Sequence, residues 1–71
     1  MTDFERNLRR DGYAVAARGC YRIADLGDLS EVLRSRDGPG PCGIIPASTH
    51  ATRESAIRWA VRDAGEVAGR G

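Results

Sequence analysis

The sequence contains no lysine and very little cysteine, histidine or aromatic residue. Its eleven basic residues are all arginine and face ten acidic residues, so the formal net charge at pH 7 is only +1. This balance lacks the basic excess that is typical of nucleic-acid-binding domains. Arginine also tolerates protein interfaces better than lysine does, and it contacts carboxylates with two parallel hydrogen bonds. The charge pattern therefore favours a protein partner.

The residues that bind metals are too few for a zinc site. Cys20 and Cys42 match no zinc-ligand spacing, and His50, the only histidine, would supply only a third ligand. We therefore expect no metal site and no cofactor. Spacing alone leaves open whether the two cysteines are free thiols or form a bridge.

Long apolar runs are also absent. No run approaches the roughly 20 residues that a membrane-spanning helix requires, and residues 1–7 lack the apolar segment of a secretory signal. We expect a cytoplasmic protein without a membrane partner. In that reducing compartment the default state of both cysteines is a free thiol.

Catalytic groups are equally scarce. His50 follows Cys42 by eight residues, but a thiol and an imidazole need a third, orienting group and a rigid scaffold. The glycines at 38, 40 and 43 lack the Gly-Lys-Ser/Thr ending of a phosphate-binding loop. We predict that the protein is not an enzyme and has no catalytic residues.

The first third of the chain predicts a helix and a hairpin. Thr2-Asp3-Phe4-Glu5 has the form of a capping box, which predicts a helix over residues 3–11 that Gly12 ends. Residues 13–18 alternate between two faces, and residues 20–25 follow them directly. We interpret these two runs as paired strands.

The rest of the chain predicts two helices around a short strand. The spacing of Leu29, Val32 and Leu33 predicts a helix over residues 28–36, and the glycines and prolines of 37–43 predict a loop. Residues 43–45 predict a third strand, which would be an edge strand if Pro46 belongs to it.

The last helix is the firmest element of the sequence. Ile57, Ala60, Val61 and Ala64 recur at helical spacing, and Ser48, Thr49 and Thr52 are alternative N-caps. Gly65 is the expected end of this helix, with residues 66–71 as a fraying tail.

These elements predict one α+β domain over residues 1–71. It has a two- to three-stranded sheet packed with three short helices in the order α-β-β-α-β-α, and an all-helical fold is the alternative. A chain this short often depends on a partner or on a second copy of itself, so a homo-oligomer stays open. The predicted core is Phe4, Leu8, Tyr13, Val15, Ile23, Leu29, Val32, Leu33, Ile44, Ile57, Val61 and Ala64.

Trp59 is the leading candidate for protein binding. On a helical wheel it lies about 160° from Ile57, away from the centre of the apolar stripe. It either folds over the edge of the stripe to cover the sheet, or it is an exposed aromatic anchor. In the second case Arg58 and Arg62 flank it, as in the hot spots of interfaces.

A second set of candidates would bind nucleic acid or another anion. These residues lie on the first helix and near the start of the last one, and they are Arg6, Arg9, Arg10, Thr49, Thr52 and Arg53. Acidic residues such as Glu5 and Glu54 are interleaved with them, and local ion pairs on a solvated surface are the alternative interpretation.

The resulting hypothesis is a small, non-enzymatic regulatory or inhibitory protein that acts by binding another macromolecule, preferentially a protein. The alternative is a nucleic-acid-binding module that uses the arginine-lined helices. A third hypothesis is an inhibitor of a nucleic-acid-processing machine, of the type that phages and mobile elements carry.

Overall fold

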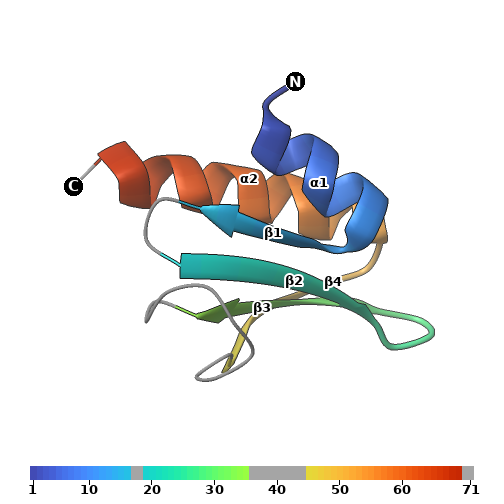
Figure 1. Cartoon of the computed structure of the whole chain (residues 1–71). Helices are drawn as coiled ribbons and strands as arrows, with labels where there is room; N and C mark the ends of the chain where they lie inside the picture. Colours follow the sequence, from blue (N-terminus) through green and yellow to red (C-terminus); the bar gives the residue numbers. More distant parts are fainter. Residues whose placement is uncertain (17–18, 36–44, 70–71) are drawn as a thin grey trace.

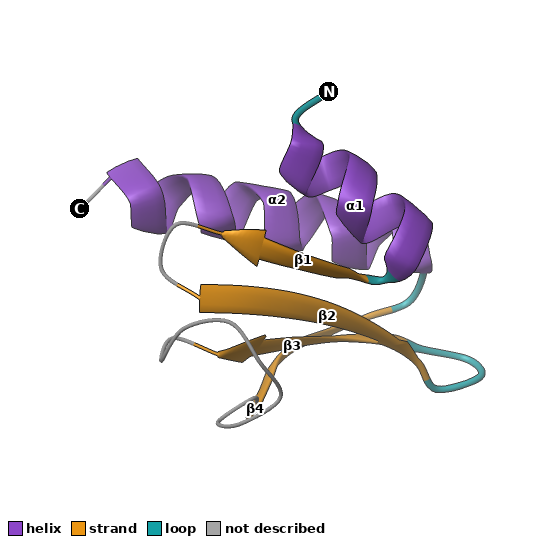
Figure 2. Ribbon diagram, viewed as in Figure 1, coloured by secondary structure: helices purple, strands orange, loops and turns teal. Residues whose placement is uncertain are grey.

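The computed structural model of the chain describes residues 1–16, 19–35 and 45–69, and it describes residues 66–69 by their backbone alone. Two helices and four strands follow one another in these ranges: α1 (Asp3–Asp11), β1 (Tyr13–Ala16), β2 (Gly19–Asp25), β3 (Ser30–Ser35), β4 (Ile45–His50) and α2 (Arg53–Gly69). The strands form one antiparallel sheet in the order β1-β2-β3-β4 (Figure 1). Both helices pack on the same face of this sheet, as Figure 2 shows. The predicted α+β class is therefore confirmed.

Helix α1 forms as its local signals predict. The Thr2 hydroxyl accepts a hydrogen bond from the Glu5 N–H at 3.2 Å, and Gly12 ends the helix in the left-handed conformation with φ 69°. The Gly12 N–H donates to the Leu8 carbonyl at 2.9 Å. These two caps satisfy backbone groups at both ends of the helix, which is why so short an element is well defined.

The predicted helix over residues 28–36 is wrong. Residues 30–35 form β3, a central strand that pairs with both β2 and β4. Val32 is fully buried opposite Ile23, whereas Leu29 lies in the preceding turn and is 45% exposed. Hydrogen bonding on both sides of the strand outweighs the helical spacing of three apolar residues. The molecule consequently has two helices and four strands in the described residues, instead of three helices and two or three strands.

The predicted hairpin of β1 and β2 is confirmed, but the predicted buried face of β1 is reversed. Ala14 is buried and Ala16 packs against the core, whereas Val15 is 50% exposed. The small alanines let α1 and α2 lie close to this end of the sheet. Tyr13 is only partly buried.

The core lies between the sheet and the two helices. Of the predicted core, Leu8, Ile23, Val32 and Ile57 are buried, and Phe4, Val61 and Ala64 pack against them. Leu33 is half-buried, and Ile44 lies outside the described residues. The core also includes residues that were not predicted: Ala14, Tyr21, Ala56 and Ala60. Phe4 and Tyr21 meet edge to face, with ring centroids 5.4 Å apart.

Strand β4 is an edge strand, as Pro46 predicts. The strand begins at Ile45 and continues to His50, so Ser48 and Thr49 lie in the sheet and only Thr52 caps α2. The register with β3 shifts between Val32 and Leu33, which is a β-bulge or a similar irregularity. The predicted loop 37–43 and the third-strand residues 43 and 44 lie outside the described residues.

Helix α2 is longer than predicted. It passes through Gly65 and ends at Gly69, so Gly65 does not stop it, and of the predicted tail only residues 70 and 71 lie outside the described residues. A glycine inside a helix costs only about 1 kcal/mol relative to alanine, and the turns before it are held by packing on the sheet. Neither helix of the described chain is long and apolar enough to cross a bilayer.

Candidate functional site

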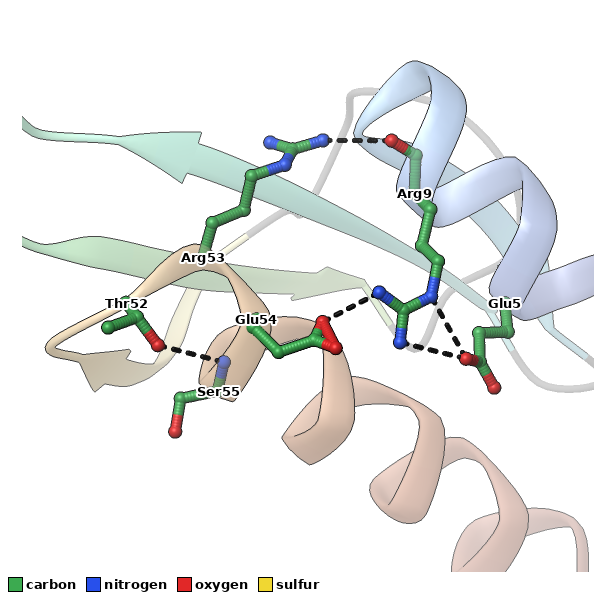
Figure 3. A network of polar contacts seen from close by, with 6 residues as sticks. All are labelled: Glu5, Arg9, Thr52, Arg53, Glu54 and Ser55. Atoms are coloured by element: carbon green, nitrogen blue, oxygen red, sulfur yellow. Dashed lines mark hydrogen bonds and ion pairs between the residues drawn. The ribbon is translucent and has the colours of Figure 1, made fainter.

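Arg9 joins the two helices through paired carboxylates. Its guanidinium contacts Glu5 on α1 at 2.9 Å and Glu54 on α2 at 2.6 Å (Figure 3). The hydrogen bond to Glu54 is the largest cause of the raised pKa of Arg9, and the same bond lowers the pKa of Glu54. Arg53 donates to the Arg9 carbonyl at 3.2 Å, which adds a second link between the helices. Arg9 and Arg53 therefore already bind groups of the same chain.

The other arginines of the anion-binding prediction are also paired. Arg6 lies 3.4 Å from Asp3, Arg10 lies 3.0 Å from Asp11, and Arg53 lies 3.5 Å from Asp25. Exposed pairs of this kind add little stability, but they cancel much of the local positive charge. The geometry therefore favours the local-ion-pair interpretation over a continuous phosphate-binding surface.

The two threonines of the same prediction are not brought together. The Thr52 hydroxyl accepts from the Ser55 N–H at 3.1 Å and caps α2 (Figure 3). Thr49 is exposed and pairs with Glu31, on the sheet face that the helices leave uncovered. The start of α2 thus already has an acceptor, which occupies the place where an external anion would bind.

Trp59 covers the sheet at its β3–β4 end. The side chain is partly buried and packs against the core. Its ring lies 5.9 Å from the guanidinium carbon of Arg34 and 6.0 Å from the ring of His50. This location matches the interpretation in which Trp59 folds over the edge of the apolar stripe. We refer to Tyr21, Arg34, His50, Trp59 and Asp63 as the Trp59 cluster.

Asp63 organises the polar part of the Trp59 cluster. It accepts a hydrogen bond from the Tyr21 hydroxyl at 2.6 Å and another from Arg34 at 2.6 Å. Burial, and then the bond to Asp63, raises the pKa of Tyr21 to about 12. Asp63 raises the pKa of Arg34 in turn. Sequence reasoning missed this network because it placed Arg34 on a helix.

The only histidine contacts a serine, and no contact with a carboxylate is found in the described part of the chain. His50 Nε2 and Ser48 Oγ lie 2.8 Å apart on β4. No carboxylate within the described residues orients the other ring nitrogen of His50, so this pair lacks the third member of a nucleophilic triad. In the same part of the chain, no three His, Cys, Asp or Glu side chains come close enough to hold a metal ion. Cys20 is buried on β2, and Cys42 lies outside the described residues.

A groove opens where the start of α1, the end of β1 and the second half of α2 meet. We call it the β1 groove. Its volume is about 430 Å³, and its lining is Thr2, Phe4, Val15, Ala16, Val61, Ala64 and Gly65. Almost all of these side chains are apolar, and none is charged. Sequence reasoning missed the groove because its walls come from both ends of the chain.

Arg58 and Arg62 lie beside the β1 groove. They line a smaller hollow of about 270 Å³ together with Glu5, Arg9 and Val61. Val61 lines both hollows, so the apolar and the cationic surfaces are continuous. The structure therefore keeps the predicted pair of arginines together but separates it from Trp59, which lies on the β4 side of α2.

Comparison with protein-family models, with curated proteins and with solved structures finds no match for this chain. The β1 groove and the arginines beside it are therefore the features from which a function can be inferred.

Proposed function

We propose that this chain is a small regulatory or inhibitory protein that acts by binding another protein, and that the β1 groove is its binding surface. The observation that carries the proposal is that an apolar groove adjoins, through Val61, a hollow lined by two arginines of α2. Apolar surface with arginine beside it is typical of protein interfaces, in which arginine is enriched.

The distribution of charge supports a protein partner. Arg6, Arg9, Arg10 and Arg53 already contact carboxylates of the same chain. Arg58 is exposed and forms no ion pair within the described residues, and its electrostatic neighbour Glu54 is already paired with Arg9. One such cation beside an apolar groove suits a side chain of a protein, whereas nucleic acid would require a row of cations along its phosphates.

Gly65 offers a clean way to test the groove. It lines the groove, and a Cβ added there would meet no atom within 4 Å. Gly65→Leu therefore adds apolar volume at the lining of the groove from an unobstructed Cβ position. Gly65→Ala is the matched control, because it makes the same change from glycine with little added volume.

The test is capture of partners from the native host's lysate by tagged protein, with and without nuclease. We expect a defined protein that survives nuclease, is retained by Gly65→Ala and is lost with Gly65→Leu. Capture that disappears after nuclease treatment would contradict the proposal and favour the nucleic-acid alternative.

A further inference from the structure

The two edges of the sheet differ in how well they are protected. Edge strand β4 contains Pro46 and lies beside the register shift of β3, and both features obstruct the addition of another strand. Edge strand β1 reads Tyr-Ala-Val-Ala, with no proline and no charge. An edge without these devices is a template for a further strand.

The register shows which backbone groups of β1 face outward. The Ile23 N–H donates to the Gly12 carbonyl at 2.8 Å, just before Tyr13 pairs with Arg22. Hydrogen-bonded and non-hydrogen-bonded pairs alternate in an antiparallel ladder. The N–H and C=O of Val15 therefore point away from β2, toward the outer edge of the sheet. Val15 is also 50% exposed.

The outward backbone of Val15 lies next to the β1 groove. Val15 and Ala16 form one wall of the groove, and Phe4, Val61 and Ala64 form the apolar remainder. A strand added to β1 would direct alternate side chains to the helix side of the sheet, where the groove lies. The exposed Arg58 stands beyond Val61 on the same side.

We propose that β1 accepts an extended segment of the partner protein as a fifth strand of the sheet. The segment pairs with the backbone of Val15, places a large apolar side chain in the β1 groove and presents a carboxylate to Arg58. This is the strand-addition mode of peptide recognition, in which the main chain supplies affinity and pockets supply specificity. The inference rests on the proposed function and specifies the chemistry of the partner.

A second copy of this chain fits the same site poorly. Antiparallel pairing of β1 with its copy would present Ala14 and Ala16 on the helix side, because these residues face the helices in β1. Two alanines leave most of a groove of about 430 Å³ empty. The strand Tyr13–Ala16 also has no carboxylate for Arg58. A foreign segment with a larger apolar residue and an acidic residue satisfies both features.

The experiment uses a displayed library of random heptapeptides selected on the full chain. We expect enriched peptides to carry a large aliphatic or aromatic residue, with Asp or Glu two or four positions away. Val15→Pro should weaken their binding by about tenfold or more, because proline removes the outward N–H that pairs with the peptide. This N–H is not used by β2, so the sheet should persist, as circular dichroism would confirm.

Two matched comparisons do not depend on how Val15→Pro folds. Methylation of the peptide nitrogen that pairs with Val15 should weaken binding as strongly while the protein stays unchanged. Arg58→Ala should weaken binding by about threefold to tenfold, whereas Arg22→Ala, which removes an exposed arginine on the uncovered face, should leave it unchanged.

Three results would overturn the inference. The first is an enriched peptide that tolerates both Val15→Pro and the methylated backbone. The second is enrichment of basic peptides, or no enrichment at all. The third is sedimentation at several concentrations that shows a dimer of the wild type which Val15→Pro abolishes, because a second copy then occupies the edge.

The inference and the proposed function fail separately. A nuclease-resistant protein partner that binds Val15→Pro normally but not Gly65→Leu would keep the groove as the binding surface and exclude strand addition. Loss of lysate capture after nuclease treatment would contradict the proposed function itself.

Discussion

Helix α2 has two sides that use neighbouring residues in different ways. On the β4 side, Trp59 packs on the sheet and Asp63 holds Tyr21 and Arg34 at 2.6 Å each. On the α1 side, Arg58 is exposed beside an apolar groove. Polar groups that are already hydrogen-bonded contribute little free energy to the binding of a partner. Exposed apolar surface and an exposed cation can contribute more, because they become buried or paired only when a partner binds. The β4 side of α2 thus contacts the rest of the fold, and our proposal assigns partner binding to the α1 side.

The largest expected effect is that of Trp59→Ala. Truncation of a large aromatic side chain packed on the core should lower the free energy of unfolding by about 3 kcal/mol. Urea titration followed by circular dichroism measures this change. Tryptophan fluorescence cannot be used, because Trp59 is the only tryptophan and the variant lacks it. If Trp59→Ala left the stability unchanged but abolished partner binding, Trp59 would be a binding residue and not a core residue.

The next effect is that of Asp63→Asn. The side chains of Arg34 and Asp63 are only 21% and 18% exposed, so removal of the carboxylate leaves a mostly buried guanidinium without its counter-charge. We expect a loss of about 2 kcal/mol, against about 1 kcal/mol for Tyr21→Phe, which removes one hydrogen bond. Equal stability of Asp63→Asn and wild type would show that the network contributes nothing.

The Trp59 cluster should also make stability fall in alkaline solution. Folding raises the pKa of Tyr21 from its ordinary value of 10.0 to about 12, so the folded state favours the neutral phenol. The contribution of the neutral Tyr21 phenol to the free energy of unfolding is therefore complete below pH 10, and it is lost as the pH rises toward 12. Urea titrations across this range should show a steeper decline for wild type than for Tyr21→Phe. Parallel declines would contradict the assignment.

A smaller effect of opposite sign is expected on the groove side. Gly65→Ala should raise the free energy of unfolding by about 0.5–1 kcal/mol, because alanine restricts the unfolded chain and Gly65 is helical with open space around it. Thermal unfolding measures the gain. A destabilised variant would show that the helix does not persist through this position.

The smallest effect is that of Arg58→Ala. We expect stability within about 0.5 kcal/mol of wild type, since the residue is exposed and forms no ion pair in the described part of the chain. The variant should nevertheless weaken binding of the selected peptides by about threefold to tenfold, whereas Arg22→Ala should leave it unchanged. A loss of stability comparable to that of Asp63→Asn would remove the difference between the two sides of α2.

Elements with local signals could be predicted from the sequence. The signals for α1 lie at its two ends, where Thr2 and Gly12 cap the helix. Pro46 alone predicts that its strand lies at an edge of the sheet. The apolar stripe of Ile57 and Ala60 predicts α2 without any knowledge of the sheet.

Elements that depend on distant partners could not be predicted. Val32 belongs to a strand because Ile23 and Ser48 pair with it, yet its spacing from Leu29 suits a helix equally well. Val15 rather than Ala14 was expected inside because the sequence does not show how closely the helices approach β1. The Trp59 cluster and the β1 groove follow from those same placements, so the sequence did not predict either.

The strand order β1-β2-β3-β4 has a consequence for how the chain folds. Each strand pairs only with its neighbour in the sequence, so the sheet assembles from contacts of low sequence separation, which form quickly. The contact of Arg9 with Glu54 instead joins residues 45 positions apart and brings together helices from opposite ends of the chain. We therefore expect the four-stranded meander to form rapidly, with its apolar face exposed until α1 and α2 pack on it. Deletion of either helix should consequently favour aggregation over folding.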